Sequence, residues 1–275
     1  MIKINNLSYN YGTLSVLENI SMELEGGKIY GLLGENGVGK TTLLTLLCGL
    51  KAPKKGSLEV DGIAPYSRNP ELLSQQYYLA DEVAPVNDKA IHWAKTTGMF
   101  WPLFDMAKFE AIMAEFENDP QKKMNQMSAG QLKKTYISFA LACNARYIYM
   151  DEPTNGLDIP SKAQFRSAIM KHTGDESTII VSTHQVRDLE NVIDPIIILD
   201  KKEVLVNASL EEISKKLYFD YGTTLNTQSL YTEQLPGGFI QVYPNMTGAE
   251  SKVNIEALFN TAHKNKDIIR ELFRK

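Results

Sequence analysis

The stretch Gly34-Glu35-Asn36-Gly37-Val38-Gly39-Lys40-Thr41-Thr42 decides the fold. The apolar run 29–33 before it is typical of a buried strand, and the apolar run 42–48 after it is typical of a helix that ends at Gly49. A strand, a glycine-rich loop ending in Lys-Thr and a helix, in this order, predict a phosphate-binding loop. The alternative is a tight glycine turn between a core strand and a core helix, and the complete loop with its flanking segments favours the phosphate site.

This loop contains the groups that hold a triphosphate. Glycines allow backbone angles that turn successive N–H groups inward as an anion nest, and the following helix adds the partial positive charge of its N-terminus. The Lys40 ammonium can neutralise the β- and γ-phosphates, and the Thr41 hydroxyl can ligate Mg²⁺. The predicted nucleotide-binding residues of the loop are Gly34, Asn36, Gly37, Gly39, Lys40, Thr41 and Thr42.

Composition restricts the classes of function. The chain has 275 residues, 43% of them hydrophobic, which suffices for one large domain or one domain with an appendage. Its net charge of −4 is spread along the chain and argues against a wide nucleic-acid-binding surface. Cys48 and Cys143 fall in apolar helical patterns and are expected to be buried in a reducing compartment. No stretch reaches the ~20 apolar residues that cross a bilayer, so a role at a membrane requires a partner.

Strand-like and helix-like segments alternate after the loop. Apolar runs predict buried strands at 77–80, 147–150, 179–183 and 196–199. Helical spacing dominates from about 88 to 145, with a break near Pro102, and its aromatic side chains favour a core over an interface. The alternation predicts an α/β fold with a mainly parallel sheet that is covered on both faces.

The remaining segments give weaker patterns. Residues 2–24 are expected to form edge β structure, with Tyr9 and Tyr11 on the intervening turn with Gly12. A further helix is expected near 185–191. Beyond about residue 210, the apolar spacing predicts a helix at 210–217, a strand at 239–243 and one charged helix at 255–274. This last region contains no catalytic constellation.

Two acidic residues stand just past the predicted strand at 147–150. The carboxyl ends of parallel strands present ligand-facing residues. Asp151 fits the acid that holds Mg²⁺ and its waters, and Glu152 fits a general base that deprotonates the attacking water. The alternative for both is a solvated acidic turn. His184 ends the strand at 179–183, where it either has a structural role or contacts the γ-phosphate and holds the water or Glu152 in place.

A second helix start with phosphate-binding character lies at 127–131. In the run Met127-Ser128-Ala129-Gly130-Gln131, a serine, a glycine and free N–H groups can form a second anion site. The same residues can equally form an ordinary N-cap, in which Ser128 satisfies the first turn of the helix. The residue types alone leave both interpretations open.

Taken together and in this order, the motifs resemble those of the ABC transporter ATPase family over residues 1 to about 210. The matching positions are Tyr11 for the aromatic residue that stacks on adenine, 34–42 for the Walker A motif, 127–131 for the signature motif, 147–151 with Glu152 for the Walker B strand and catalytic glutamate, 155–158 for the D-loop and His184 for the switch histidine. The signature motif is the most specific of these, because phosphate-binding loops occur in many families.

The resemblance implies a fold and an assembly. The fold is a P-loop NTPase (RecA-like) core with a mainly parallel sheet, an antiparallel β edge subdomain and an inserted α-helical subdomain at about 82–145. The family works as head-to-tail pairs, so we expect a homodimer or a pair with a related ATPase subunit. The helical subdomain would contact an integral membrane permease at the inner face of the cell membrane. The extension at 211–275 resembles that of exporter-type bacterial ATPases.

The same resemblance implies how the two copies share one nucleotide. ATP and Mg²⁺ would be sandwiched between the Walker A motif of one copy and the signature motif of the other. Ser128, Gly130 and Gln131 would then bind the γ-phosphate that Lys40 of the other copy holds. Asp158, at the end of the D-loop motif, would belong to the same nucleotide site.

Two positions depart from the family pattern. The signature motif usually has glycine where this chain has Ala129, which adds a methyl group near phosphate and would make any positive φ costly. The glutamine that senses Mg²⁺ and water usually ends a Tyr-Leu-Pro-Gln-like run, and here the run at 78–81 ends in Asp81. We carry Asp81 over as a metal ligand, although its carboxylate adds negative charge near the phosphates.

The sequence therefore predicts the ATP-hydrolysing subunit of an ABC transporter, which powers a separate permease through ATP-driven dimer closure. One rival is a soluble ABC-type ATPase that acts on nucleic acid or ribosomes. Such proteins usually carry two ATPase units or long coiled coils, whereas this chain has one phosphate loop, no heptads and no basic run. A second rival is a weakly hydrolysing regulatory nucleotide binder, which Ala129 and Asp81 favour and the intact Asp151, Glu152 and His184 disfavour.

Overall fold

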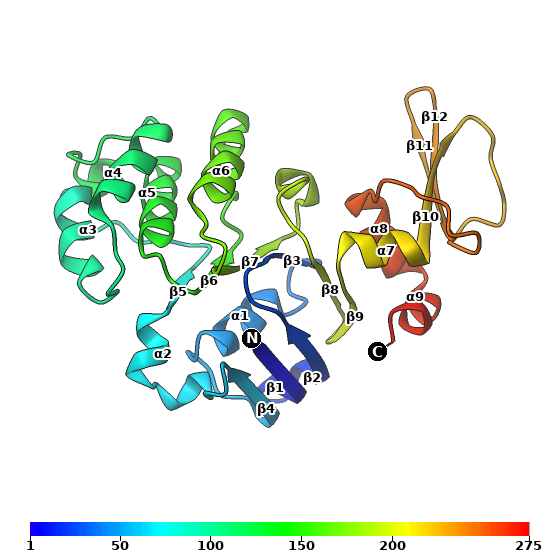
Figure 1. Cartoon of the computed structure of the whole chain (residues 1–275), viewed down its shortest axis with the longest axis horizontal. Helices are drawn as coiled ribbons and strands as arrows, with labels where there is room; N and C mark the ends of the chain where they lie inside the picture. The colour runs from blue at the N-terminus through cyan, green and yellow to red at the C-terminus, as the bar shows by residue number, and fades with distance from the viewer. Residues whose placement is uncertain (275) are drawn as a thin grey trace.

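A six-stranded sheet forms the centre of the chain in the computed structural model, which describes residues 1–274 (Figure 1). The strand order is β5-β6-β7-β3-β8-β9. All neighbours are parallel except β9, which runs antiparallel to β8. The strands are β3 (Ile29–Leu33), β5 (Gln76–Leu79), β6 (Tyr147–Asp151), β7 (Thr178–Thr183), β8 (Ile196–Asp200) and β9 (Glu203–Ala208). The predicted α/β fold with a mainly parallel sheet is confirmed.

Both faces of this sheet are buried, which explains why its strands are apolar without alternation. Successive side chains of a strand point to opposite faces. In β6, Tyr147 and Tyr149 join the core that contains α1 (Lys40–Leu47), whereas Ile148 and Met150 join the core that contains α5 (Ala129–Ala142) and α6 (Ile159–His172). Cys48 and Cys143 are free and buried as expected, and burial raises the pKa of the Cys48 thiol to about 11.

The N-terminal residues form a separate antiparallel sheet of order β2-β1-β4. Its strands are β1 (Ile2–Tyr11), β2 (Leu14–Leu24) and β4 (Lys55–Val60). The prediction that Tyr9 and Tyr11 lie on the turn is wrong, because both belong to β1 and pair with Leu17 and Leu14 of β2. The turn itself is at Gly12, whose φ of +56° suits glycine.

The helical insert forms the left-hand part of Figure 1. It follows the short helices η1 (Pro65–Ser67) and α2 (Pro70–Ser74) and contains α3 (Ala90–Gly98), α4 (Met106–Glu115), η2 (Met124–Gln126) and α5. Trp93 and Trp101 pack against Phe139 with ring-centroid distances of 4.6 and 5.6 Å, as a core requires. Phe100, in contrast, is 75% exposed. Within residues 1–274, none of the helices has the length and apolar character of a membrane span.

The C-terminal module, residues 210–273, forms the right-hand part of Figure 1. It comprises α7 (Leu210–Lys216), β10 (Leu217–Gly222), β11 (Tyr231–Leu235), β12 (Gly238–Pro244), α8 (Ile255–Lys264) and α9 (Lys266–Phe273). Its strands have the order β10-β12-β11. Buried residues of the module, such as Leu258, share one core with β7 and β8.

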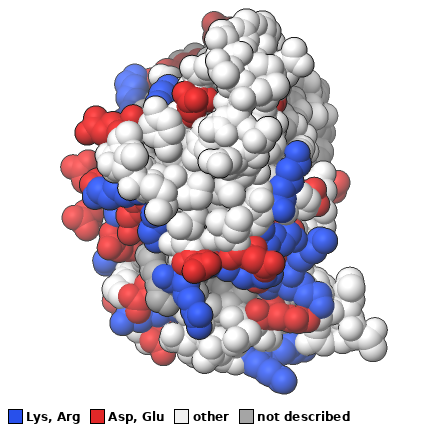
Figure 2. Space-filling view, turned by 90° about the vertical axis from the view of Figure 1, so that its right-hand side faces the viewer, with Lys and Arg blue, Asp and Glu red and all other residues white. Residues whose placement is uncertain are grey.

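Several C-terminal predictions need correction. The single helix predicted at 255–274 is two helices that meet at Asn265, and the helix predicted near 185–191 is the short 3₁₀ helix η3 (Val186–Leu189). Strands β10 and β11 lay outside the sequence prediction. The outer surface of the module is largely uncharged in its upper part (Figure 2), because Glu233 is the single charged residue in the segment 221–249.

Candidate active site

The phosphate-binding loop closes around the side chain of Lys40. This residue begins α1, two positions earlier than the apolar run indicated, and is 6% exposed. Its ammonium donates hydrogen bonds to the carbonyl oxygens of Gly34 at 2.8 Å and Glu35 at 3.3 Å. It also lies 3.2 Å from Oε1 of Glu152. The loop therefore holds one positive charge where β3 ends and α1 begins.

Two of the loop glycines are required by the geometry. Gly39 has a φ of +115°, and a Cβ atom there would also lie 2.9 Å from Val16. A Cβ atom at Gly34 would lie 2.6 Å from the carbonyl oxygen of Leu199. A side chain at Gly34 would push the loop away from β8, and one at Gly39 would push it away from β2, so the two glycines let the loop pack closely between these strands.

Asp151 lies at the end of β6 beside the loop. It is 1% exposed, and its Oδ2 accepts a hydrogen bond from the Thr41 hydroxyl at 2.6 Å. Its Oδ1 accepts one from the Ser182 hydroxyl at 2.5 Å. The Tyr78 hydroxyl donates to Oδ2 at 3.4 Å, and burial raises the pKa of Tyr78, so this donor keeps its proton. The hydroxyl and carboxylate oxygens of Thr41 and Asp151 are the hard ligands that Mg²⁺ prefers.

Glu152 is held between the phosphate loop and the end of β7. Its backbone has a φ of +45°, a left-handed conformation that typically costs on the order of 1–3 kcal/mol and often marks functional sites. Its side chain is buried, with Oε2 at 2.9 Å from Nδ1 of His184. Its Oε1 is buried and, among residues 1–274, forms the ion pair with Lys40 but accepts no hydrogen bond. The structure thus brings Lys40, Glu152 and His184 together.

Ser182 is a residue that the sequence analysis missed. Its hydroxyl donates to Asp151, and its hydroxyl and carbonyl oxygens both accept from the Glu152 backbone N–H at 3.1 Å. The two neighbouring acids are therefore fixed by one residue of the adjacent strand β7. The signal available in the sequence was a pair of hydroxyl residues, Ser182 and Thr183, at the end of an apolar run.

The signature run begins α5 with a capping box. The Ser128 hydroxyl accepts from the Gln131 N–H at 3.2 Å, and the Gln131 side chain accepts from the Ser128 N–H at 3.1 Å. Ser128 thus caps the helix, and its contact with phosphate stays a prediction. Ala129 is the first helical residue of α5, so the positive φ that would make alanine costly does not occur. A Cβ atom at Gly130 would lie 3.6 Å from the carbonyl oxygen of Gly156, which places the signature run beside the D-loop segment.

Three further predicted site residues contact side chains or backbone other than the acids Asp151 and Glu152. They are Asp81, Tyr11 and Asp158. The Asp81 carboxylate contacts Lys133 and Asn155, so its role as a metal ligand stays a prediction. The Tyr11 ring is partly exposed and its hydroxyl lies 3.3 Å from Oγ1 of Thr42.

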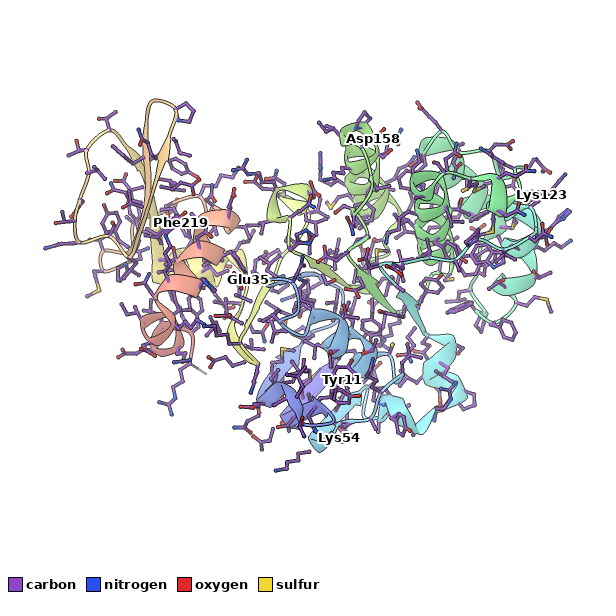
Figure 3. All side chains as sticks on the ribbon, turned by 180° about the vertical axis from the view of Figure 1, so that it is seen from behind. Tyr11, Glu35, Lys54, Lys123, Asp158 and Phe219 are labelled. Carbon is purple, nitrogen blue, oxygen red and sulfur yellow. The ribbon has the colours of Figure 1, made fainter. Side chains whose placement is uncertain are left out.

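Asp158 caps α6 by accepting from the Ser161 N–H at 2.9 Å. In Figure 3, Asp158 lies at the end of α6 that points away from the sheet, whereas Tyr11 lies below the sheet. The predicted stacking of Tyr11 on adenine and the predicted part of Asp158 in the nucleotide site stay predictions.

The C-terminal module reaches the phosphate loop. His263 of α8 lies with Nε2 at 3.8 Å from Oε1 of Glu35 and with Nδ1 at 3.6 Å from Oδ2 of Asp200. The Lys266 ammonium pairs with the same buried Asp200 carboxylate. These contacts join residues more than 60 positions apart in the sequence, and the sequence pattern contains no signal for them.

Comparison with known proteins agrees with this geometry. Residues 17–155 match the family model described as ABC transporter. An uncharacterized ABC transporter ATP-binding protein of Methanocaldococcus jannaschii is 30% identical over 244 residues, which cover 84% of this chain and 88% of that protein. The ABC transporter ATP-binding protein YtrB of Bacillus subtilis is 26% identical over 232 residues, covering 82% and 79%.

Solved structures share the fold. An ATP-binding subunit of an ABC transporter superposes with a TM-score of 0.69 at 23% identity and covers 78% of this chain and 91% of that chain. A dimeric ATP-binding cassette bound to ADP and Pi superposes with a TM-score of 0.66 at 23% identity and covers 76% and 99%. The strand–loop–helix site, the family match and the archaeal relative together show that this chain belongs to the ABC transporter family, as one of its ATPase domains.

Proposed function

We propose that the protein is the ATP-binding and ATP-hydrolysing subunit of an ABC transporter and that it drives a separate integral membrane permease. The observation that carries this proposal is the convergence of Lys40, Asp151, Glu152 and His184 at one edge of the parallel sheet. The relatives named above are ABC transporter ATP-binding proteins, which supports the same function for this chain. The exporter-like subtype stays a prediction.

The side chains of the site divide the work of hydrolysis. Lys40 and the loop N–H groups would bind the phosphates of ATP, and Thr41 and Asp151 would hold Mg²⁺, whose charge offsets that of the phosphates. Glu152 would take a proton from the attacking water at Oε1, which accepts no hydrogen bond from residues 1–274. His184 holds the other carboxylate oxygen at 2.9 Å and so keeps Oε1 aimed at the site.

We propose further that two copies pair head to tail, with each signature run completing the site of the other copy. The free N–H groups at the start of α5 suit an anion. The signature run lies beside Gly156 of the D-loop segment. A dimeric cassette among the structural neighbours supports this arrangement.

A permease would dock in the apolar groove between the end of α1, α2 and the helical insert. This groove of about 610 Å³ is lined mainly by apolar side chains, among them Leu50, Leu73, Phe100 and Trp101. Leu50 and Phe100 are 57% and 75% exposed. Exposed apolar surface of this kind fits an amphipathic helix of a partner, and the protein would then lie at the inner face of the cell membrane. Co-purification with membranes separates this proposal from the soluble rival that acts on nucleic acid.

The experiment that tests the proposed function is the substitution Glu152→Gln. The variant keeps the shape of the side chain but loses the general base, so we expect kcat for ATP hydrolysis to fall by on the order of 10²–10⁴. The affinity for ATP, measured by isothermal titration, stays within a few-fold. Phosphate release at saturating ATP measures the rate.

Two controls accompany this variant. Glu176→Gln removes an exposed carboxylate from a turn and leaves the rate unchanged. Lys40→Ala removes the buried ammonium that faces the phosphates and weakens ATP binding itself. Near-normal hydrolysis by the Glu152→Gln variant, or unchanged ATP affinity of the Lys40→Ala variant, would contradict the roles assigned here.

A further inference from the structure

Asp81 joins three segments at one point. The Lys133 ammonium, in the second turn of α5, donates to the Asp81 carbonyl oxygen and lies 3.5 Å from its Oδ1. The Asn155 amide donates to the same Oδ1 at 3.2 Å, and the Asn155 N–H donates to the Glu152 carbonyl oxygen at 3.1 Å. The segment after β5, the signature helix and the loop that follows the catalytic glutamate therefore meet at the Asp81 carboxylate.

Lys133 needs a negative partner because it is buried. It is 2% exposed, whereas the Asp81 side chain is 39% exposed. A buried ammonium is costly unless it is paired and hydrogen-bonded. Burial lowers the pKa of Lys133, and the charge of Asp81 opposes this shift. Asp151 and Glu152 act in the same direction as Asp81, so Lys133 lies within electrostatic reach of both catalytic acids.

These contacts lie on the face that carries the signature run. A groove of about 560 Å³ is lined by Asp81, Lys133 and Asn155 together with Ala129 and Gly156. A change in the Asp81–Lys133 distance would therefore shift the start of α5 against the loop that follows Glu152. The neutral glutamine that is usual at position 81 in the family would remove the counter-charge that contacts the Lys133 ammonium directly.

We propose that Asp81 and Lys133 form a positioning pair that sets α5 and the loop 152–158 relative to β6, in place of the metal-ligand role that the resemblance implied for Asp81. Asp81 acts through Lys133 and Asn155 and is not a catalytic residue. The part of this inference that concerns turnover rests on the ATPase function proposed above. The part that concerns the pair itself does not, so the two can fail separately.

The test is a double-mutant cycle with Asp81→Asn, Lys133→Met and the double variant. Lys95→Met, which removes an exposed lysine of α3, is the matched control. Urea unfolding of the protein without added nucleotide measures the pair independently of hydrolysis. The rate assay then measures kcat, KM for ATP and the Mg²⁺ concentration that gives the half-maximal rate.

We expect the two substitutions to be coupled. The double variant should be about as stable as Lys133→Met alone. Its unfolding equilibrium constant should differ from the value expected for additive effects by about 2-fold to 100-fold. Each single variant should lower kcat by about 10-fold at unchanged KM and unchanged Mg²⁺ requirement, because a displaced α5 affects geometry and not metal binding. The Lys95→Met variant should behave like the wild type.

Two results would contradict the proposal that Asp81 and Lys133 act as a positioning pair. Additive effects on the unfolding equilibrium would show that Asp81 and Lys133 do not act together. The Mg²⁺ concentration that gives the half-maximal rate could also rise about 10-fold or more in Asp81→Asn but not in Lys133→Met. This result would show that Asp81 is a metal ligand. If the wild type itself shows no hydrolysis, the proposed function fails, and the unfolding cycle still decides whether the pair exists.

Discussion

At the scale of single residues, the candidate site depends on side chains that perform no chemistry themselves. Lys40, Asp151, Glu152 and His184 could be predicted because each stands where an apolar strand or a glycine loop ends. Ser182 could not, because its contacts exist only once β6 and β7 lie side by side in the sheet. Adjacency of strands is a property of the sheet order, which local patterns do not contain.

The substitution Ser182→Ala should destabilise the protein. It removes the hydroxyl that donates to the buried Asp151 carboxylate at 2.5 Å. A buried charged group that loses a hydrogen bond costs about 1–3 kcal/mol in the free energy of unfolding. Urea denaturation measures this difference. The exposed Ser67→Ala change is the control, and its free energy of unfolding should stay within about 0.5 kcal/mol of the wild type. Equal stability of the two variants would show that the Ser182 hydroxyl contributes nothing.

At the scale of elements, the strands buried on both faces were predictable and so was the alternating, half-buried β1, whereas β10 and β11 were not. An apolar run such as 179–183 indicates a strand in the middle of a covered sheet. Strands β10 and β11 expose one side, mix polar with apolar residues and lack clear alternation. The helix predicted at 255–274 divides at Asn265 without a proline or glycine to mark the division.

Ser128 provides a test that separates capping from phosphate binding. Replacing an N-cap serine by alanine costs about 1 kcal/mol in stability, whereas glycine costs only a few tenths. Ser128→Ala and Ser128→Gly both remove the hydroxyl that would meet phosphate in the other copy. We therefore expect unequal loss of stability in thermal denaturation but an equal loss of ATPase rate. If the Ser128→Gly variant hydrolyses ATP at the wild-type rate, Ser128 acts only as the N-cap of α5 and does not bind phosphate.

At the scale of the whole molecule, the C-terminal module is part of the surroundings of the phosphate loop. Its buried residues share a core with the central sheet, and α8 contacts both Glu35 and Asp200. Arg187, three residues after His184, lies 2.6 Å from Glu256 at the start of α8. The module therefore contacts the phosphate loop and the segment after the switch histidine at once.

Lys266→Met should loosen this module. The substitution leaves the buried Asp200 carboxylate with His263 as its remaining basic neighbour. We expect a loss of about 1–3 kcal/mol in the free energy of unfolding, below the full cost of breaking a buried ion pair because Lys266 is partly exposed. Hydrogen exchange of α8, together with urea denaturation, measures the effect.

The exposed Lys252→Met change is the control for this prediction. Adding Asp200→Asn to Lys266→Met should recover part of the lost stability, because the unpaired charge is then removed. No recovery in the double variant, or equal exchange in α8 of the Lys266→Met and wild-type proteins, would contradict a role of this ion pair in docking the module.

The aromatic core of the helical insert gives the protein a built-in optical signal. Trp93 and Trp101 are its two tryptophans, and both belong to the insert. The Trp101 indole N–H donates to the Gln76 carbonyl oxygen of β5 at 3.0 Å, so this ring spans the boundary between insert and sheet. A rotation of the insert against the sheet would break this bond and change the polarity around the indole. Intrinsic fluorescence would therefore follow such a motion in the unlabelled protein, in real time and without an attached dye.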